Sequence, residues 1–115
     1  MRRGEIRLVD LDPVRGSESN KRRPAVIVSN DSANAAAAGL GRGVITVVPI
    51  TSNVSRILPF QVLLLAEAVG LRVDSKAQAE QLRSVAVARL GPAVGRLPAP
   101  VMAQLDDALR LHLQL

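Results

Sequence analysis

The residues best suited to chemistry lie in one polar stretch, Arg15-Gly16-Ser17-Glu18-Ser19-Asn20-Lys21-Arg22-Arg23-Pro24. Its small polar residues predict a loop, three successive cations close it, and an apolar run begins at Ala25. Because a guanidinium can bind phosphate through two parallel hydrogen bonds, such a loop suits a phosphodiester. Pro24 restricts Arg23 to extended backbone angles, so the direction of this side chain is partly preset. From composition alone, a solvated basic loop is the simpler interpretation.

A second group of candidate residues follows a later apolar run. Pro49-Ile50 is succeeded by Thr51, Ser52 and Asn53, whose hydroxyl and amide groups can donate hydrogen bonds to phosphate oxygens or to base edges. The same residue types also form ordinary turns, because their side chains hydrogen-bond to nearby backbone. Taken alone, this motif indicates only that a strand ends.

The chain lacks the residues of several common mechanisms. It has no cysteine, its one histidine (His112) lies among leucines, and no carboxylate pair or metal-ligand spacing is evident. If such a chain cleaves nucleic acid, cations and hydroxyls must stabilise the charge that develops on phosphorus. RNA carries its own nucleophile, the 2′-hydroxyl, whereas DNA has no equivalent group. An arginine–threonine site without metal or cofactor therefore points to RNA.

The composition indicates one globular domain over residues 1–115, with 48% hydrophobic and 22% charged residues. We expect neither a transmembrane helix nor a signal peptide, and the absence of cysteine fits the cytoplasm. The net charge of +5 rests on 15 cationic residues, all arginine except Lys21 and Lys76, which suits a polyanionic partner. Phe60 is the only aromatic residue, so base stacking on aromatic platforms is excluded.

The elements that must position these residues are predicted to be mostly strands. Short aliphatic runs bounded by turn residues predict strands at residues 5–11, 25–29, 44–50 and 61–65. The alternating pattern over residues 76–85 favours another strand, although its residue types also suit a helix. Within this segment, Glu80 and Arg83 could form an exposed ion pair.

Two helices are also predicted. Residues 32–39 form a short helix if Ser32 is its N-cap and Gly39 ends it, with an alanine-rich loop as the alternative. The C-terminal segment predicts an amphipathic helix opened by Pro98 and Pro100. Its apolar face carries Met102, Leu105, Leu109 and Leu113. Close-spaced strands followed by a terminal helix predict a compact, mainly antiparallel barrel.

The order of the short motifs resembles that of the MazF/PemK-type toxins. The matching segments are Arg3-Gly4-Glu5-Ile6, Val9-Asp10-Leu11-Asp12-Pro13, Gly16-Ser17-Glu18, Arg23-Pro24-Ala25-Val26-Ile27-Val28, Pro49-Ile50-Thr51, Pro59-Phe60-Gln61-Val62 and Ala79-Glu80-Gln81-Leu82-Arg83-Ser84. With the closing helix they cover nearly the whole chain, although Arg7 stands where relatives often carry an aromatic. The resemblance implies a mainly β fold, a small SH3-like antiparallel barrel with a C-terminal amphipathic helix and short helical insertions.

The resemblance also implies an activity. Toxins of this family are sequence-specific, metal-independent endoribonucleases that cleave single-stranded RNA to a 2′,3′-cyclic phosphate and a 5′-hydroxyl. They act as homodimers and are neutralised by an antitoxin, for which we expect an acidic, amphipathic tail. The arginine and threonine of the family's catalytic site fall on Arg23 and Thr51, and no metal or cofactor is expected. RNA contacts are expected from Ser17, Glu18, Lys21, Arg22, Ser52, Gln81 and Arg83.

Other functions remain open at this point. A toxin of the same fold can bind DNA gyrase, in which case supercoiling is inhibited and RNA stays whole. A non-catalytic RNA-binding barrel would use the basic loop only for affinity through counterion release, and would shift RNA without cutting it. In a purely structural interpretation, the polar motifs are turns and the charge maintains solubility.

Overall fold

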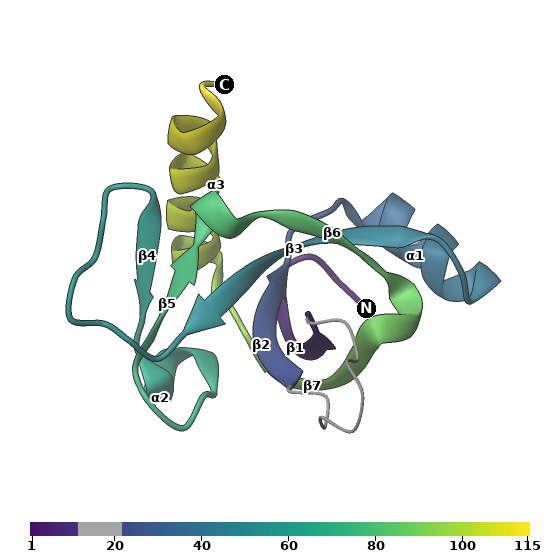
Figure 1. The fold of residues 1–115 in the computed structure, drawn as a ribbon, viewed down its shortest axis with the longest axis horizontal. Helices are drawn as coiled ribbons and strands as arrows, with labels where there is room; N and C mark the ends of the chain where they lie inside the picture. The colour runs from purple at the N-terminus through teal and green to yellow at the C-terminus, as the bar shows by residue number, and fades with distance from the viewer. Residues whose placement is uncertain (12–21) are drawn as a thin grey trace, which may run out of the picture.

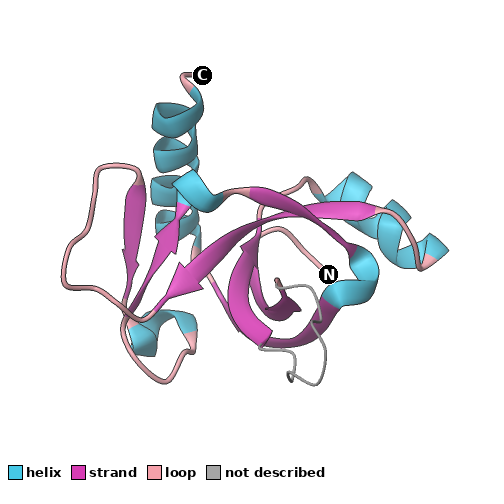
Figure 2. Ribbon diagram, in the orientation of Figure 1, coloured by secondary structure: helices cyan, strands magenta, loops and turns pink. Residues whose placement is uncertain are grey.

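The computed structural model of the chain describes residues 1–11 and 22–115 (Figure 1). Within these ranges the chain forms one seven-stranded antiparallel sheet, three α-helices and two short 3₁₀ turns (Figure 2). In chain order the elements are β1 (Glu5–Asp10), β2 (Arg22–Ile27), α1 (Asp31–Leu40), β3 (Val44–Thr51), β4 (Gln61–Leu64), α2 (Ala66–Val69), β5 (Ser75–Gln78), η1 (Ala79–Gln81), β6 (Arg83–Ala86), η2 (Val87–Arg89), β7 (Leu90–Arg96) and α3 (Ala99–Leu113).

The sheet is organised around β3, whose two edges pair with three other strands. One edge pairs with β2, while the other pairs first with β6, along residues 44–47, and then with β5, at Ile50 and Thr51. The strand order is β4-β5-β3-β2-β1-β7, and β6 lies off this path. The mainly antiparallel β fold with a C-terminal helix is therefore confirmed. The predicted barrel is not closed, because the strand pairings among described residues follow an open, curved path from β4 to β7 (Figure 1).

Two buried clusters cover the two faces of the sheet, as the period of two along a strand requires. The first, on which α3 packs, includes Ile6, Val26, Val48, Leu64 and Leu105. The second, which α1 helps to cover, includes Val9, Ala25, Ile27, Ile45 and Val47. Neighbouring residues of β2 thus belong to opposite cores, so the sheet is buried on both sides over much of its centre.

The two predicted helices are confirmed, with different ends for the first. The side chain of Asn30 accepts a hydrogen bond from Ala33 N at 2.8 Å, which makes Asn30, and not Ser32, the N-cap of α1. The helix continues past Gly39 to Leu40. Its C-cap is Gly41, whose φ of 64° lies in the left-handed region that favours glycine. On α3, Leu105 is fully buried as predicted, whereas Leu113 is 45% exposed.

The segment 76–85 is not one strand. It divides into β5, η1 and β6, because β5 and β6 must pair with successive parts of the same edge of β3. The 3₁₀ turn η1 moves the chain from one pairing to the next. The short helix α2 and the strand β7 were not predicted at all. No helix in the described part of the chain is long and apolar enough to span a membrane.

Candidate functional site

Strands β2 and β3 bring Arg23 and Thr51 together. The register pairs Ala25 with Pro49, and it advances by one residue on each strand. These pairs end at Ala25 and Pro49, and Arg23 and Thr51 lie two residues beyond them at the same end of the two strands. Both residues line the same two hollows in the surface. A guanidinium and a hydroxyl from distant parts of the sequence therefore lie in one cleft.

Two hollows in the surface meet at this pair. The first has a volume of about 520 Å³ and lies toward the segment between α2 and β5; Arg72 of this segment and Ser52, which follows β3, contribute to its walls. The second, of about 360 Å³, lies toward η1 and β6. Arg23 and Thr51 line both. An extended ligand that crosses the pair would thus have space on each side; we call the two hollows together the Arg23–Thr51 cleft.

The predicted RNA contacts divide into three sets. Ser52, Gln81 and Arg83 line the Arg23–Thr51 cleft. Arg22 lines neither hollow, and a Cβ atom added at Gly91 of β7 would come within 2.9 Å of its guanidinium, so its side chain lies over β7. Ser17, Glu18 and Lys21 lie outside the described residues.

The hydroxyl of Thr51 is oriented by the turn that follows β3. Asn53 N donates to Thr51 Oγ1 at 3.2 Å, and Asn53 Oδ1 accepts from the backbone N and the Oγ of Ser55 at 3.3 and 2.8 Å. Since Thr51 Oγ1 accepts this backbone N–H, its own proton is available to a ligand in the cleft. Thr51 itself is half-buried, whereas this hydrogen bond lies at the surface.

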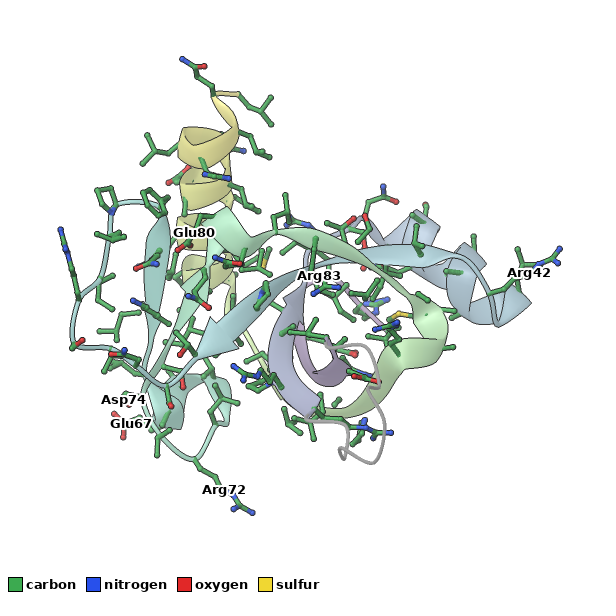
Figure 3. The ribbon with its side chains drawn as sticks, viewed as in Figure 1. Arg42, Glu67, Arg72, Asp74, Glu80 and Arg83 are labelled. Atoms are coloured by element: carbon green, nitrogen blue, oxygen red, sulfur yellow. The ribbon has the colours of Figure 1, made fainter. Side chains whose placement is uncertain are left out.

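Arg83 reaches the cleft while anchored to another strand. Its Nη1 donates to Leu11 O at 3.0 Å, so β6 is tied to the end of β1. The ion pair expected between Glu80 and Arg83 is wrong, because the two side chains lie apart (Figure 3). Glu80 Oε2 instead accepts from Gln61 Nε2 at 2.6 Å. This second contact holds η1 against β4. Because η1 and β6 are fixed from two directions, the wall that carries Gln81 and Arg83 is well defined.

Three further polar residues line the cleft that sequence analysis did not select. Arg72 and Ser75 line the first hollow, and Gln78 lines the second. Lys76 and Gln78 alternate with Ala77 along β5, and this alternation was the only sequence signal that could have indicated Gln78. Arg72 lies in an irregular segment with no periodic pattern, so only the fold reveals its position.

The described residues offer little to a metal or to histidine chemistry at this site. They contain no group of three or more histidine, cysteine, aspartate or glutamate side chains placed to hold a metal ion. His112 lies on α3, where its ring is 6.0 Å from the ring of Phe60, and it lines neither hollow of the cleft. Cations, hydroxyls and amides thus make up the chemical groups of the described cleft.

The antiparallel fold with a cationic and hydroxyl-bearing cleft corresponds to a known class of small toxins. Residues 2–113 match the family described as PemK-like, MazF-like toxin of type II toxin-antitoxin system. The chain belongs to this family.

Two relatives match along nearly their full length. The chain is 66% identical over 115 residues to Endoribonuclease MazF9 of Mycobacterium tuberculosis (strain ATCC 25618 / H37Rv), with 100% of this chain and 98% of the relative covered. It is 31% identical over 116 residues to Endoribonuclease EndoA of Bacillus subtilis (strain 168), with 100% and 96% covered.

Solved structures have the same fold. The MazE-MazF (Form-II) structure from Deinococcus radiodurans matches with a TM-score of 0.78 at 26% identity, over 100% of this chain and 96% of that one. The Mycobacterium tuberculosis toxin MazF-mt6 matches with a TM-score of 0.77 at 24% identity, over 96% and 97%. The second likeness concerns the fold alone.

Proposed function

We propose that this chain is an endoribonuclease that cleaves single-stranded RNA in the Arg23–Thr51 cleft, as the toxin of a toxin–antitoxin pair. The observation that carries the proposal is that one guanidinium, of Arg23, and one oriented hydroxyl, of Thr51, line both hollows of the cleft. Membership of the toxin family and the endoribonuclease names of the two full-length relatives support the activity. We treat residues 1–115 as one domain.

The proposed reaction is a transesterification within RNA. The 2′-oxygen of one ribose attacks the adjacent phosphorus, the bond from phosphorus to the 5′-oxygen breaks, and the products carry a 2′,3′-cyclic phosphate and a 5′-hydroxyl. Negative charge increases on the non-bridging oxygens as the pentacovalent phosphorane forms. Arg23 stabilises this charge with its planar pair of N–H groups and assists proton transfer at the scissile oxygens. The Thr51 hydroxyl donates a hydrogen bond to a non-bridging oxygen. Because the Thr51 hydroxyl is oriented before the substrate binds, little reorganisation is required of this group.

The rest of the cleft binds the strand on both sides of the scissile phosphate. Arg72 and Ser52 lie on one side, and the amides of Gln78 and Gln81 lie with Arg83 on the other. Arginines contact phosphates, while glutamine amides can both donate to and accept from the edges of unpaired bases, which is how single-stranded RNA is distinguished by sequence. Ser17, Glu18 and Lys21 remain predicted contacts, and Arg22 contacts RNA only beyond the cleft.

The partners follow from the charge and the family. The net charge of +5 favours a polyanionic substrate and an antitoxin with an acidic, amphipathic tail that covers the cleft. A structure matched at 26% identity is by its name a MazE-MazF structure, which supports such a complex. We expect the toxin to act as a homodimer in the cytoplasm, on messenger RNA and without a cofactor.

The test is cleavage of a long mixed-sequence RNA in EDTA, mapped by primer extension. We expect the wild type to cut at defined positions and to leave 5′-hydroxyl ends that polynucleotide kinase labels without prior phosphatase treatment. Arg23→Ala and Thr51→Val should each lower kcat by about 100-fold or more, the range for loss of one group that stabilises a developing oxyanion.

Arg42→Ala is the matched control for Arg23→Ala. Arg42 is exposed in the connection between α1 and β3, lines neither hollow of the cleft, and lies far from Arg72 in Figure 3. This variant should cut at the wild-type rate. The proposal is contradicted if wild-type protein leaves RNA whole, or if both cleft variants cut normally. Intact RNA together with inhibited gyrase supercoiling would identify a gyrase-binding toxin.

A further inference from the structure

Lys76 is a buried cation that the proposed reaction does not use. It lies on β5 directly opposite Thr51 of β3, so the two side chains share one face of the sheet. Only 9% of the residue is exposed, and it lines neither hollow of the Arg23–Thr51 cleft. Its Nζ donates to Arg56 O at 2.7 Å. The ammonium thus contacts the backbone of the segment that connects β3 to β4.

Burying the charged side chain of Lys76 carries a cost in desolvation free energy. An ammonium group loses hydration when it is buried, and this costs several kcal/mol unless hydrogen bonds or opposite charges compensate. None of the ion pairs between described residues includes Lys76. An apolar side chain of similar length would fill the same volume without this penalty. The hydrogen bond to Arg56 O is therefore the contribution of Lys76 that an apolar side chain could not make.

That contact begins a short series of hydrogen bonds that ends at the Thr51 hydroxyl. Lys76 fixes the backbone at Arg56, and the preceding residue, Ser55, donates from both its N and its Oγ to Asn53 Oδ1. Asn53 N then donates to Thr51 Oγ1. At its far end the same segment is held by Gln61, whose Oε1 accepts from Leu58 N at 2.9 Å. With both ends held, the conformation at Asn53 depends on where Arg56 is fixed.

We propose that Lys76 is a positioning residue: it anchors the 52–60 segment so that Asn53 N keeps the Thr51 hydroxyl turned as a donor into the cleft. The inference rests on the proposed function, since it assigns Lys76 to the orientation of a catalytic group. Lys76 acts through Thr51 and contacts no substrate. Its effect on the reaction should therefore depend on the presence of the Thr51 hydroxyl.

The experiment is a double-mutant cycle on RNA cleavage with Lys76→Met and Thr51→Val. Methionine keeps the length of the side chain and removes the donor. With Thr51 present, we expect Lys76→Met to lower kcat by about tenfold and to change KM by less than about threefold, since small misplacements of catalytic groups cost up to about 100-fold. With Thr51→Val, the same change should lower the residual kcat by less than twofold. Arg42→Met is the matched loss of a cation at an exposed site and should leave kcat unchanged.

A second measurement does not require RNA cleavage. Amide hydrogen exchange, followed by NMR, should speed up at Asn53 and Ser55 in Lys76→Met, whereas the amide of Val48 in the core of β3 should exchange as in the wild type. If Lys76→Met fails to fold, Ser55→Ala removes one contact of the same series at an exposed position and should give a smaller loss of kcat with the same dependence on Thr51.

Three results would overturn the inference: an unchanged kcat in both Lys76→Met and Ser55→Ala, equal losses of kcat with and without the Thr51 hydroxyl, or an increase in KM alone. Equal losses would show that Lys76 acts on RNA through its charge. If instead the wild type does not cleave RNA, the proposed function fails, and the exchange of the Asn53 amide still decides whether Lys76 orders the segment.

Discussion

Replacing Leu105 with alanine tests how the C-terminal helix stabilises the sheet that carries the cleft. Leu105 lies in the middle of α3 and is fully buried in the first core cluster, which also contains Ile6, Val26 and Leu64. These neighbours belong to β1, β2 and β4. The substitution removes several buried carbon atoms and leaves a cavity between helix and sheet.

The magnitude follows from burial and from the rigidity of the surroundings. Leucine-to-alanine changes at fully buried sites cost about 2.7–5 kcal/mol, and the cost is higher where the structure cannot collapse into the cavity. Strand pairing on both sides of β1 and β2 limits such collapse. We therefore expect a loss of about 4 kcal/mol of unfolding free energy. With about 2.1 cal/mol/K of unfolding entropy per residue over 115 residues, this lowers Tm by about 17 °C.

Leu111→Ala is the control, because it makes the same chemical change on the same helix. Leu111 is 57% exposed, so its loss should cost less than about 0.5 kcal/mol. The assay is urea unfolding followed by circular dichroism, at one protein concentration for all variants, because self-association would make stability depend on concentration. Midpoints that coincide for the two variants would refute the packing of α3 described above.

Three further predictions concern the site and the backbone. Arg23→Lys keeps the charge but loses the planar fork, so kcat for RNA cleavage should fall by at least about tenfold; near-normal turnover would show that charge alone suffices. In α1, Gly39→Ala places its new Cβ with no heavy atom within 4 Å and should raise the unfolding free energy by about 0.5–1 kcal/mol. Gly95→Ala instead places Cβ against the backbone carbonyl of Val69 and should lower the unfolding free energy by about 1–3 kcal/mol. Equal urea midpoints for the two variants would contradict both expectations. Asn34→Ala removes a fully buried amide that forms two hydrogen bonds with Ser29, before α1, and should lower the unfolding free energy by about 1–3 kcal/mol. A negligible change in thermal unfolding would show that these hydrogen bonds contribute little to stability.

Local patterns were sufficient for the elements with clear periodicity. The aliphatic runs predicted β1, β3 and β4 to within two residues, and the spacing of Met102, Leu105 and Leu109 predicted the apolar face of α3. These features depend on a period of two or of 3.6 residues, which neighbouring residues define among themselves. The helix caps of α1 were wrong, because several residues near each end could serve and only the backbone angles decide among them.

The choice of Arg23 and Thr51 also came from the sequence, through motif order. Their proximity did not, because it depends on the register between β2 and β3, and no local pattern determines which residues of two distant strands stand opposite each other. The separate register between β3 and β5 likewise places Lys76 opposite Thr51. Alternation along β2 also turns Arg22 away from the cleft that its neighbour lines.

The sequence by itself thus determined the kinds of element, the charge of the partner and the residue types available for catalysis. Tertiary structure alone decided which of these residues meet and that segment 76–85 divides into two strands on one edge of β3. It also decided that Lys76, which no sequence motif singled out, is buried opposite Thr51. The physical reason is that side-chain chemistry and periodicity are properties of neighbouring residues. Register and burial instead arise from long-range pairing and from the packing of both sheet faces.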